Sequence, residues 1–351
     1  MSPPPSSRSR RSPRIPEIAA AAGVSASTVD RVLNERGSVS DALRRRVIEA
    51  ARSLEVRRVL PALHHGVLHF DVVLPGTGMP HFQRLDRAIQ AYAQAIGPHV
   101  SIHRTFWREG EEAALRNFLL RPPYRRAGLL AMVRDVERIR ACLRRVQAEG
   151  TPVVTITSDV GEIGPHPYVG IDNAMAGRTA AYLLGRFVRR PGKVWLPVMS
   201  MEFRDHSERV AGFRRTLAER FPALQPCTPS AHHDNDALAQ AQMQAALEQH
   251  PDIVAIYNTG TGNAGIHQAL RHLPPAEAPV WITHEATFGN AELMAKGYVA
   301  AVMDQDPEAQ AQEGLNHLLR ACGEVERVPP PRSIHFRVIT PENVPWDELN
   351  A

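Results

Sequence analysis

The sequence predicts a mixed architecture: a small all-α helix-turn-helix domain followed by a two-lobed, doubly wound α/β domain. The first sign is a short helical period, broken once by glycine, near the N-terminus. The second is the regular alternation of apolar strand candidates with helical segments from Val67 onward. The third is the length of 351 residues, which exceeds one ordinary core.

The domain boundaries follow from where these patterns change. The predicted parts are a disordered arm (1–13), a helix-turn-helix domain (14–57), a linker or hinge (58–66) and a two-lobed domain (67–345). Within the last part, the first lobe is predicted to cover about 67–158 and 306–334, and the second about 162–303 and 335–345.

Composition excludes several protein classes. An apolar content of 43% with 22% charged residues is typical of a soluble globular protein. The longest apolar runs, such as Gly128–Val133, are far shorter than a membrane span, and the basic N-terminus has no apolar block of a secretory signal after it. The three scattered cysteines, Cys142, Cys227 and Cys322, form neither a disulfide framework nor a zinc-binding spacing. We therefore expect a cytoplasmic protein with no membrane partner.

Charge is segregated along the chain. Residues 1–60 contain twelve arginines and six acidic residues, whereas the remainder is close to neutral. The chain has only two lysines, Lys193 and Lys296, so its preference for arginine carries little weight and the segregation is what counts. A basic N-terminal module on a near-neutral body indicates a polyanionic partner.

Three short helices are predicted in the basic module. Pro16 can begin the first, which runs to Ala22. Ser25 can cap a second helix over Ala26–Asn34, and Ser40 a third over Asp41–Leu54. Any small three-helix cluster would show this period, so the spacing alone does not distinguish a DNA reader from another helical domain.

The identities of the residues in these three helices are a more specific signal of function than the helical spacing of the apolar positions. The segment IPEIAAAAGVSASTVDRVLNERGSVSDALRRRVIEAA resembles the DNA-binding domain of the lactose-repressor (LacI) family. The family pattern A-x-x-A-G-V-S-x-x-T-V-x-R-V-L-N matches Ala19–Asn34, and V-S-x-x-x-R-x-x-V matches Val39–Val47. The resemblance implies a homodimer that binds a double-stranded DNA operator, with the second helix in the major groove.

The resemblance also assigns roles to residues of the second helix. Ala26 and Ser27 occupy the positions that read bases, and Arg31, one turn further, is the strongest candidate for a bidentate guanine contact. Phosphate contacts, which position the module without reading sequence, fall to Ser25, Thr28 and Asn34.

The linker departs from the family pattern. The family usually has Tyr-x-Pro-Asn followed by a hinge helix, but here the Asn is missing and Pro61 lies where that helix would run. Leu63 could still act as a wedge in the minor groove. Whether residues 58–66 form a hinge helix stays open, as does the choice between a groove-binding arm and a plain tail for residues 1–13.

Strands and helices alternate through the rest of the chain, with helices predicted over Phe82–Ile96 and Met175–Val188. Repeated βαβ units favour parallel sheets covered on both faces, and eight strands suit two lobes better than one. The strand candidates are Phe70–Leu74, Val100–His103, Gly128–Val133, Val153–Thr157, Val194–Val198, Ile253–Tyr257, Val280–Thr283 and Ala300–Met303.

Landmarks in this part resemble the effector domain of the same family, which has the fold of ribose-type periplasmic binding proteins. Met79–Phe82 matches the family's Asn-Pro-Phe-Phe, with His81 in place of an aromatic residue. Val169–Gly177 matches the crossing into the second lobe, Arg209–Phe213 matches Arg-x-x-Gly-Phe, and Ala301–Pro307 matches the return to the first lobe. The resemblance implies a small-molecule effector held between the lobes.

Candidate ligand contacts lie at the carboxyl ends of the predicted strands, where open α/β sheets bind ligands. Phe82 can supply an apolar face for a sugar or polyol. Polar partners are expected from His81, Ser158, Asp159, Arg209, Asn258, Glu285 and Gln305. Asp172 and Asn173 are expected to cap a helix rather than contact ligand.

Sequence motifs bear on two rival functions. Gly260–Gly265 is a literal G-x-G-x-x-G after a strand, with Glu285 some twenty residues further on, so a dinucleotide-sensing regulator is the alternative reading. An enzyme is not expected, because the chain has no GxSxG, HExxH or GxxxxGK motif. The sixteen histidines lack ligand spacing, and we expect neither a metal nor a cofactor. Whether ligand releases or promotes DNA binding stays open.

Overall fold

A computed structural model describes residues 14–36, 39–56, 60, 67–76, 79–108, 110–324 and 328–349. The predicted arm (1–13) and, within the linker, Pro61 and Leu63 lie outside the described residues. The chain divides into two compact units: residues up to 68 together with 319–329, and residues 69–318 together with those after 329.

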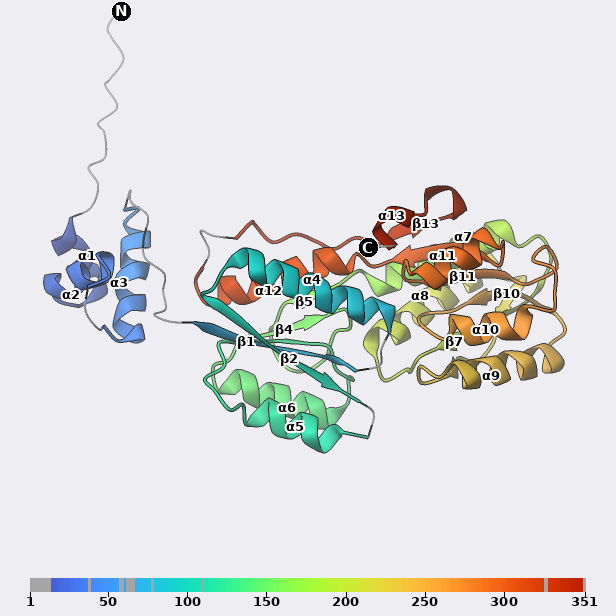
Figure 1. The fold of residues 1–351 in the computed structure, drawn as a ribbon, viewed down its shortest axis with the longest axis horizontal. Helices are drawn as coiled ribbons and strands as arrows, with labels where there is room; N and C mark the ends of the chain where they lie inside the picture. Colours follow the sequence, from blue (N-terminus) through green and yellow to red (C-terminus); the bar gives the residue numbers. More distant parts are fainter. Residues whose placement is uncertain are drawn as a thin grey trace, which may run out of the picture. The chain divides into compact units, whose positions relative to one another are not determined.

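The first unit contains the three predicted helices, each within one residue of its expected ends: α1 (Ile15–Ala22), α2 (Ala26–Leu33) and α3 (Asp41–Ser53) (Figure 1). Ser25 caps α2 through a hydrogen bond that its Oγ accepts from the amide of Thr28. The helices enclose a common core, whose members include Ile18, Val29, Val32, Leu33, Val47 and Ile48.

Two arginines of α3 fix the turns between these helices. Gly23 ends α1 with φ +61, a left-handed conformation that favours glycine, and its carbonyl accepts a hydrogen bond of 3.0 Å from Arg46 Nη2. The buried Arg44 reaches Glu35, which follows α2, at 2.8 Å. Because both turns are tied to α3, the orientation of α2 is fixed within the unit.

The second unit is built on two parallel sheets. The first sheet has the order β2-β1-β3-β4-β5, with α4 (Pro80–Ile96) and α12 (Pro307–Ala321) on one face and α5 (Glu112–Leu120) and α6 (Glu137–Ala148) on the other (Figure 1). Its strands are β1 (Leu68–Pro75), β2 (Val100–Trp107), β3 (Gly128–Ala131), β4 (Val153–Ile156) and β5 (Tyr168–Val169). The almost fully buried β1 and β3 are typical of strands covered on both faces.

The second sheet has the order β13-β12-β11-β10-β6-β8, in which only β13 runs antiparallel to its neighbour. Its strands are β6 (Gly192–Trp195), β8 (Leu224–Pro226), β10 (Ile253–Tyr257), β11 (Val280–His284), β12 (Val299–Asp304) and β13 (Arg337–Ile339). A small parallel pair, β7 (Pro197–Val198) and β9 (Ser230–Ala231), lies apart from it. The chain ends in a 3-10 turn (Pro341–Asn343) and α13 (Trp346–Leu349).

Helices cover both faces of the second sheet. On one face, α9 (Asp236–Gln249), α10 (Asn263–Leu270) and α11 (Phe288–Ala295) share one apolar cluster with residues of β10, β11 and β12. On the other, α8 (Arg204–Arg220) stacks Phe213 on Tyr257 of β10 at 4.5 Å, and α7 (Asn173–Phe187) packs on α8. The two doubly wound lobes predicted from the sequence are therefore confirmed.

The lobe boundary and one strand differ from the prediction. Because β5 pairs with β4, the first sheet continues to Val169, so the second lobe does not begin near residue 162 and the crossing follows Val169, at the landmark Val169–Gly177. The predicted strand Val194–Val198 is divided at Leu196 between β6 and β7, which join different sheets. The return crossing follows β12 as expected, and residues 330–336 then lead back to β13.

Helices α7 and α8 touch backbone to backbone. A Cβ added at Gly177 would lie 2.0 Å from the carbonyl oxygen of Arg209, and one added at Gly212 would lie 2.2 Å from that of Ala174. Glycine is therefore required at both positions. This close approach brings the first residue of α7, Asn173, beside Arg209 of α8.

Candidate effector site and DNA-reading surface

The candidate DNA-reading residues occupy the exposed side of α2. Ser25, Ala26, Ser27, Arg31 and Asn34 are exposed, and Thr28 is half-buried, whereas the apolar residues of the same helix face the core. The Arg31 guanidinium lies along the helix, with Nε and Nη2 each 3.4 Å from oxygens of Ser27. These long, exposed contacts leave the guanidinium able to turn outward. The structure thus presents the predicted residues together on one helix.

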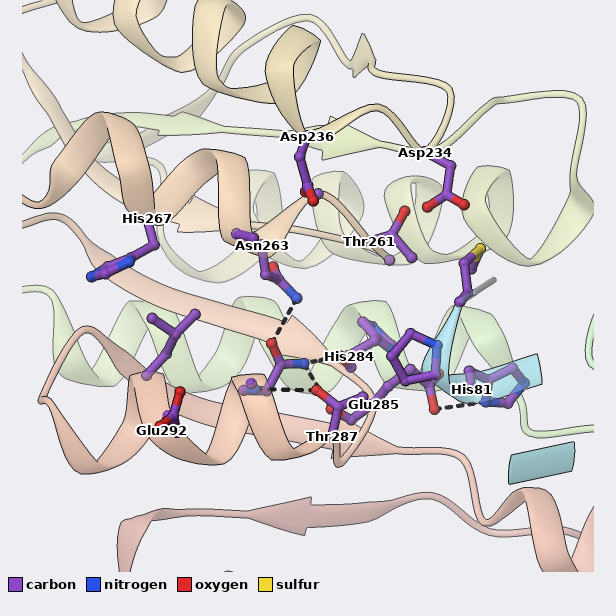
Figure 2. Close-up of a pocket in the computed structure, with 18 of the residues that line it drawn as sticks. His81, Asp234, Asp236, Thr261, Asn263, His267, His284, Glu285, Thr287 and Glu292 are labelled. Atoms are coloured by element: carbon purple, nitrogen blue, oxygen red, sulfur yellow. Dashed lines mark hydrogen bonds and ion pairs between the residues drawn. The ribbon is translucent and has the colours of Figure 1, made fainter. Parts of the chain in front are cut away.

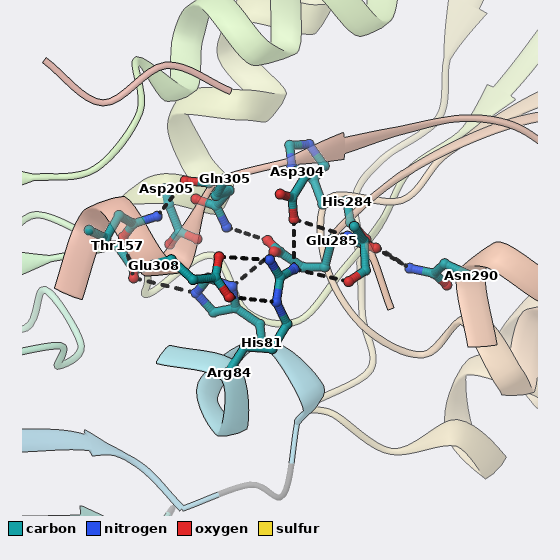
Figure 3. Close-up of polar contacts among 12 residues, drawn as sticks. His81, Arg84, Thr157, Asp205, His284, Glu285, Asn290, Asp304, Gln305 and Glu308 are labelled. Atoms are coloured by element: carbon teal, nitrogen blue, oxygen red, sulfur yellow. Dashed lines mark hydrogen bonds and ion pairs between the residues drawn. The ribbon is translucent and has the colours of Figure 1, made fainter. Parts of the chain in front are cut away.

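A buried group of polar side chains joins the two lobes (Figure 3). His81 of α4 lies with Nδ1 2.8 Å from Glu285 Oε2, and Glu285 also accepts a hydrogen bond from Gln305. On the first lobe, Thr157 donates to Gln310 at 2.8 Å, and Gln310 in turn donates to the Gln305 carbonyl. We call these five residues the interlobe cluster. Three of its members, His81, Glu285 and Gln305, were predicted from the sequence as polar contacts of the ligand.

The backbone is strained where two strands enter this cluster. Thr157 follows β4 with φ +64, and Glu285 follows β11 with φ +71. Both values lie in the left-handed region, which is unusual for any residue other than glycine and more so for the β-branched Thr157. Such strain gathers at binding sites, where the surrounding structure has to hold it.

Arg209 organises the second-lobe side of the cleft. Its buried guanidinium donates Nε to Asn173 Oδ1 at 2.9 Å and Nη1 to the carbonyl of Thr259 at 2.6 Å. Nη2 lies 3.6 Å from Asp205 Oδ2, and the Asp205 amide is 3.3 Å from Ser158 Oγ of the first lobe. Burial works against ionisation of Asp205, but His206 and Arg209 outweigh it and hold the pKa of Asp205 below its usual value.

Three buried polar atoms in this region have no hydrogen-bond partner among the described residues: Asp205 Oδ1, Arg209 Nη2 and Gln305 Oε1. An unmet buried donor or acceptor costs about 1–3 kcal/mol. Three of them among the residues that join the two lobes indicate a site made to be completed by a polar ligand.

An arginine of the first lobe contacts the second lobe beside the cluster (Figure 3). Arg84 of α4 donates from Nη1 to Asp304 of β12 at 2.9 Å, while its Nε and Nη2 pair with the two carboxylate oxygens of Glu308 in its own lobe. Asp304 is fully buried and also accepts from Arg337. Burial opposes the charge on Asp304, but the arginines overcome it and lower its pKa. Asp304 is therefore a buried anchor between the two lobes.

The remaining predicted residues have other partners. The Asp159 carboxylate accepts from Thr155, Val160 and His166 within its own lobe and lies 3.9 Å from Arg204 of α8, so its oxygens already have partners in the protein. Asn258 donates to Thr261 and Asn263 and shapes the loop before α10. Phe82 is buried with its ring against that of His81.

Helix capping was predicted correctly for one of two residues. Asp172 caps α7 by accepting from the Met175 amide at 2.7 Å. Asn173, by contrast, points into the protein: it donates to the Tyr168 hydroxyl at 3.0 Å while accepting from Arg209. Asn173 therefore links the crossing segment to the arginine of the cleft.

Sequence reasoning missed Asp205, His206 and His284. Asp205 precedes Arg209 by four residues, a spacing that places both on one face of a helix and could have revealed the pair. His284 immediately precedes Glu285, and its Nε2 forms a hydrogen bond of 3.0 Å with the Tyr257 hydroxyl. No comparable signal marks the buried His206, whose Nδ1 lies 2.7 Å from Thr259 Oγ1.

Acidification is expected to destabilise the second lobe. Burial lowers the pKa of His206 and His284 and brings that of His232 to about 4. Since unfolded histidine titrates near pH 6.5, the unfolded state binds more protons between there and about pH 4, and stability falls as pH falls through this window. His232 alone should cost about 2 kcal/mol at about pH 5.

His166 contributes to stability in the opposite direction, but it is one histidine against the three whose pKa is lowered. Asp159 raises the pKa of His166, so its stabilisation is present below pH 6.5 and is lost as pH rises. Urea unfolding at about pH 7.5 and pH 5 would measure the sum, and His232→Gln should flatten the difference. Equal midpoints at both pH values would contradict the prediction.

The Gly260–Gly265 turn lacks the surroundings of a pyrophosphate site. It opens α10 rather than the first βαβ unit, and Asp236 Oδ1 already accepts from the Gly265 amide at 3.3 Å. A carboxylate at the helix N-terminus disfavours a second anion there. Glu285, the proposed ribose partner, is taken up by the interlobe cluster. The dinucleotide alternative is therefore not favoured.

Comparison with known proteins places both domains. Residues 14–57 match the model of the bacterial regulatory proteins of the lacI family, and residues 70–324 match that of the periplasmic binding protein domain. No helix among the described residues has the length and apolarity to cross a membrane.

Two curated relatives are transcriptional regulators. The chain is 29% identical over 272 residues to the HTH-type transcriptional regulator GntR of Pseudomonas aeruginosa, covering 74% of this chain and 75% of that protein. It is 40% identical over 101 residues to YkvZ of Bacillus subtilis, an uncharacterized HTH-type transcriptional regulator, covering 28% of this chain but only 32% of YkvZ.

Solved structures of similar fold are sugar-binding proteins. GanP, a glucose-galactose binding protein from Geobacillus stearothermophilus, has a TM-score of 0.71 at 19% identity, covering 80% of this chain and 100% of its own. A solute binding protein from Burkholderia graminis in complex with D-arabinose has a TM-score of 0.72 at 19% identity, covering 80% and 98%. At this identity the likeness establishes the fold. The two family matches show that the chain belongs to the lacI family of bacterial regulatory proteins and has a periplasmic-binding-protein domain after its helix-turn-helix.

Proposed function

We propose that this chain is a homodimeric transcription regulator whose affinity for an operator is controlled by a small sugar or polyol held between its two lobes. The observation that carries the proposal is the set of unpartnered buried atoms at the cleft, Asp205 Oδ1, Arg209 Nη2 and Gln305 Oε1. The sugar-binding neighbours of similar fold support it.

The chemistry of these atoms favours hydroxyl groups. Two are acceptors and one is a charged donor, and a hydroxyl is both a donor and an acceptor. Neighbouring hydroxyls on one ring could therefore satisfy all three. A ligand that offered only hydrogen-bond acceptors would leave the acceptor atoms Asp205 Oδ1 and Gln305 Oε1 without a donor. This role requires the protein to bind its ligand but not to convert it, so no enzymatic activity is proposed. Because the operator lies on the chromosome, the protein would act in the cytoplasm.

The lobes offer a route from ligand to DNA. Because the interlobe cluster and Arg84 bridge the two sheets, a ligand among them would shift the balance between more open and more closed forms. In a dimer this shift would change the separation of the two DNA-reading helices. Ligand and operator must then alter each other's affinity by the same factor.

A thermal-shift screen of sugars, cyclitols and dinucleotides on the full chain would test the proposal. We expect at least one hydroxyl-rich compound to raise the melting temperature and to change operator affinity. Stabilisation by dinucleotides alone would contradict it, as would a sugar that binds tightly and leaves operator affinity unchanged.

Arg31→Ala is expected to weaken operator binding by about 1–3 kcal/mol and to relax preference at one base position. The exposed guanidinium has only long contacts to Ser27, so its removal should spare the fold. Thr28→Ala serves as the comparison, because a lost phosphate contact should weaken all sequences alike. Titration of operator and random duplexes measures both. Equal losses on the two duplexes for Arg31→Ala would show that it contacts phosphate only.

A further inference from the structure

A cavity of about 540 Å³ extends beyond the interlobe cluster into the second lobe. His81 and Glu285 line one end, and the cavity continues between α10 and α11 to His267 and Lys296. Figure 2 shows His81 and His267 at opposite ends of this space. The cavity therefore begins at two residues of the interlobe cluster and extends into a second region formed by the second lobe.

Polar and apolar groups alternate on the walls of this second region. Asn263 donates to Asn290 at 2.9 Å, which fixes a polar edge between the two helices. Leu293 of α11 supplies an apolar patch. A Cβ added at Gly289 would meet no atom of the described residues within 4 Å, so the space above α11 is unfilled at this point. An apolar face with fixed polar edges is typical of a small-molecule site.

Two polar atoms on the wall have no hydrogen-bond partner in the described part of the chain. His284 is fully buried; its Nε2 is engaged by Tyr257 at 3.0 Å, while Nδ1 is unpartnered. Thr261 Oγ1 is the other such atom. Both residues line the cavity. Their unmet hydrogen bonds indicate a polar occupant next to the interlobe cluster rather than only within it.

Charge decides what kind of occupant fits. The acidic lining residues are Asp234, Asp236, Glu285 and Glu292, and Lys296 is the single lysine of the lining, 3.8 Å from Glu292. Burial lowers the pKa of His267, which keeps it neutral near pH 7. This excess of carboxylates would repel a phosphate or carboxylate extension and accept hydroxyl groups as donors.

We propose that the effector is an elongated neutral carbohydrate, with one sugar ring between the lobes and a second ring in the cavity between α10 and α11, beside Gly289. This inference rests on the proposed function. It adds that the second lobe recognises a ring that the first lobe does not touch, and that this ring selects a disaccharide over its component sugars.

Gly289→Trp in the full chain tests the second ring directly. The position is exposed, and its added Cβ meets nothing, so the indole can fill the cavity without displacing the core. Gly289→Ala is the matched control, because it adds a Cβ and leaves the cavity open. The probes are maltose, lactose, sucrose, trehalose, cellobiose and melibiose, with glucose, galactose, fructose and glucose 6-phosphate, each titrated by calorimetry.

We expect one disaccharide to bind the wild-type chain at least about tenfold more tightly than any monosaccharide, which corresponds to 1.4 kcal/mol. Gly289→Trp should remove that advantage and retain monosaccharide binding, while Gly289→Ala keeps both. A disaccharide that binds no more tightly than monosaccharides, or keeps its affinity in Gly289→Trp, overturns the inference but leaves the proposed function standing. Tighter binding of glucose 6-phosphate overturns the neutral class. If none of the sugars binds, the inference is overturned, and if the screen of sugars and cyclitols also finds no ligand, the proposed function fails as well.

Discussion

Deleting residues 1–60 is expected to abolish operator binding and leave sugar affinity unchanged. The helix-turn-helix has its own core and its own polar ties, Arg44 to Glu35 and Arg46 to Gly23. The residues proposed to bind sugar all belong to the other unit. Because phosphate contacts supply most of the affinity of such modules, the intact chain should also lose affinity steeply as salt rises. Gel-shift titration and calorimetry measure the two affinities separately.

A less drastic change serves as the control for this deletion. Val29→Asp places a carboxylate in the core of the helix-turn-helix, where Val29 is fully buried, and should remove operator binding while keeping the chain at full length. Specific retardation of the operator by the truncated protein would place the DNA-binding surface elsewhere.

The helix-turn-helix could be predicted almost residue for residue because its signals are local. Ser25 and Ser40 cap helices through their own side chains, and Gly23 adopts the left-handed conformation that ends α1. These features depend on neighbours within one turn, which a single sequence displays. The same locality explains why the long, fully buried strand β10 was predicted with its observed ends.

The strands that were missed are short and lie at sheet edges or outside the main sheets. β5 and β9 have two residues each, and β8 and β13 have three. Runs of this length show no period, and their pairing is decided by the partner strand rather than by their own residues. The misplaced lobe boundary has the same cause, since β5 is the strand that extends the first lobe.

The candidate site could be predicted only partly. The ends of strands can be recognised in a sequence, but the direction in which a side chain points cannot. His81, Glu285 and Gln305 each follow a landmark and meet in the interlobe cluster. Asp159 also follows a strand, yet it turns back to His166 and Thr155. The role of Asn173 depends on the contact between α7 and α8, which joins residues 36 positions apart and cannot be inferred from local pattern.

Arg209→Ala is expected to abolish the response of operator affinity to sugar. Nη2 is the charged donor proposed to meet the ligand, and losing a charge-assisted hydrogen bond should weaken binding by roughly 1.5–3 kcal/mol. The loss should exceed this, because Asn173 Oδ1, the Thr259 carbonyl and Asp205 would lose their partner as well. Removing one member of a buried ion pair costs about 3–5 kcal/mol of stability, so the variant needs a folding control.

Gln305→Ala provides that control, since it removes the unpartnered Oε1 of the same cleft without taking away a buried charge. Both variants should bind operator nearly as the wild type does in the absence of sugar, because neither residue belongs to the DNA-binding unit. With sugar, both should fail to shift operator affinity, and Arg209→Ala should show the larger loss of calorimetric affinity. Because sugar and operator change each other's affinity by the same factor, a variant that binds sugar with normal affinity but shows no change in operator affinity would have lost the coupling between the two sites and not the sugar site. Wild-type sugar affinity in both variants would move the ligand away from Arg209 and Gln305, and the cavity beside Gly289 would then hold the whole ligand rather than its second ring.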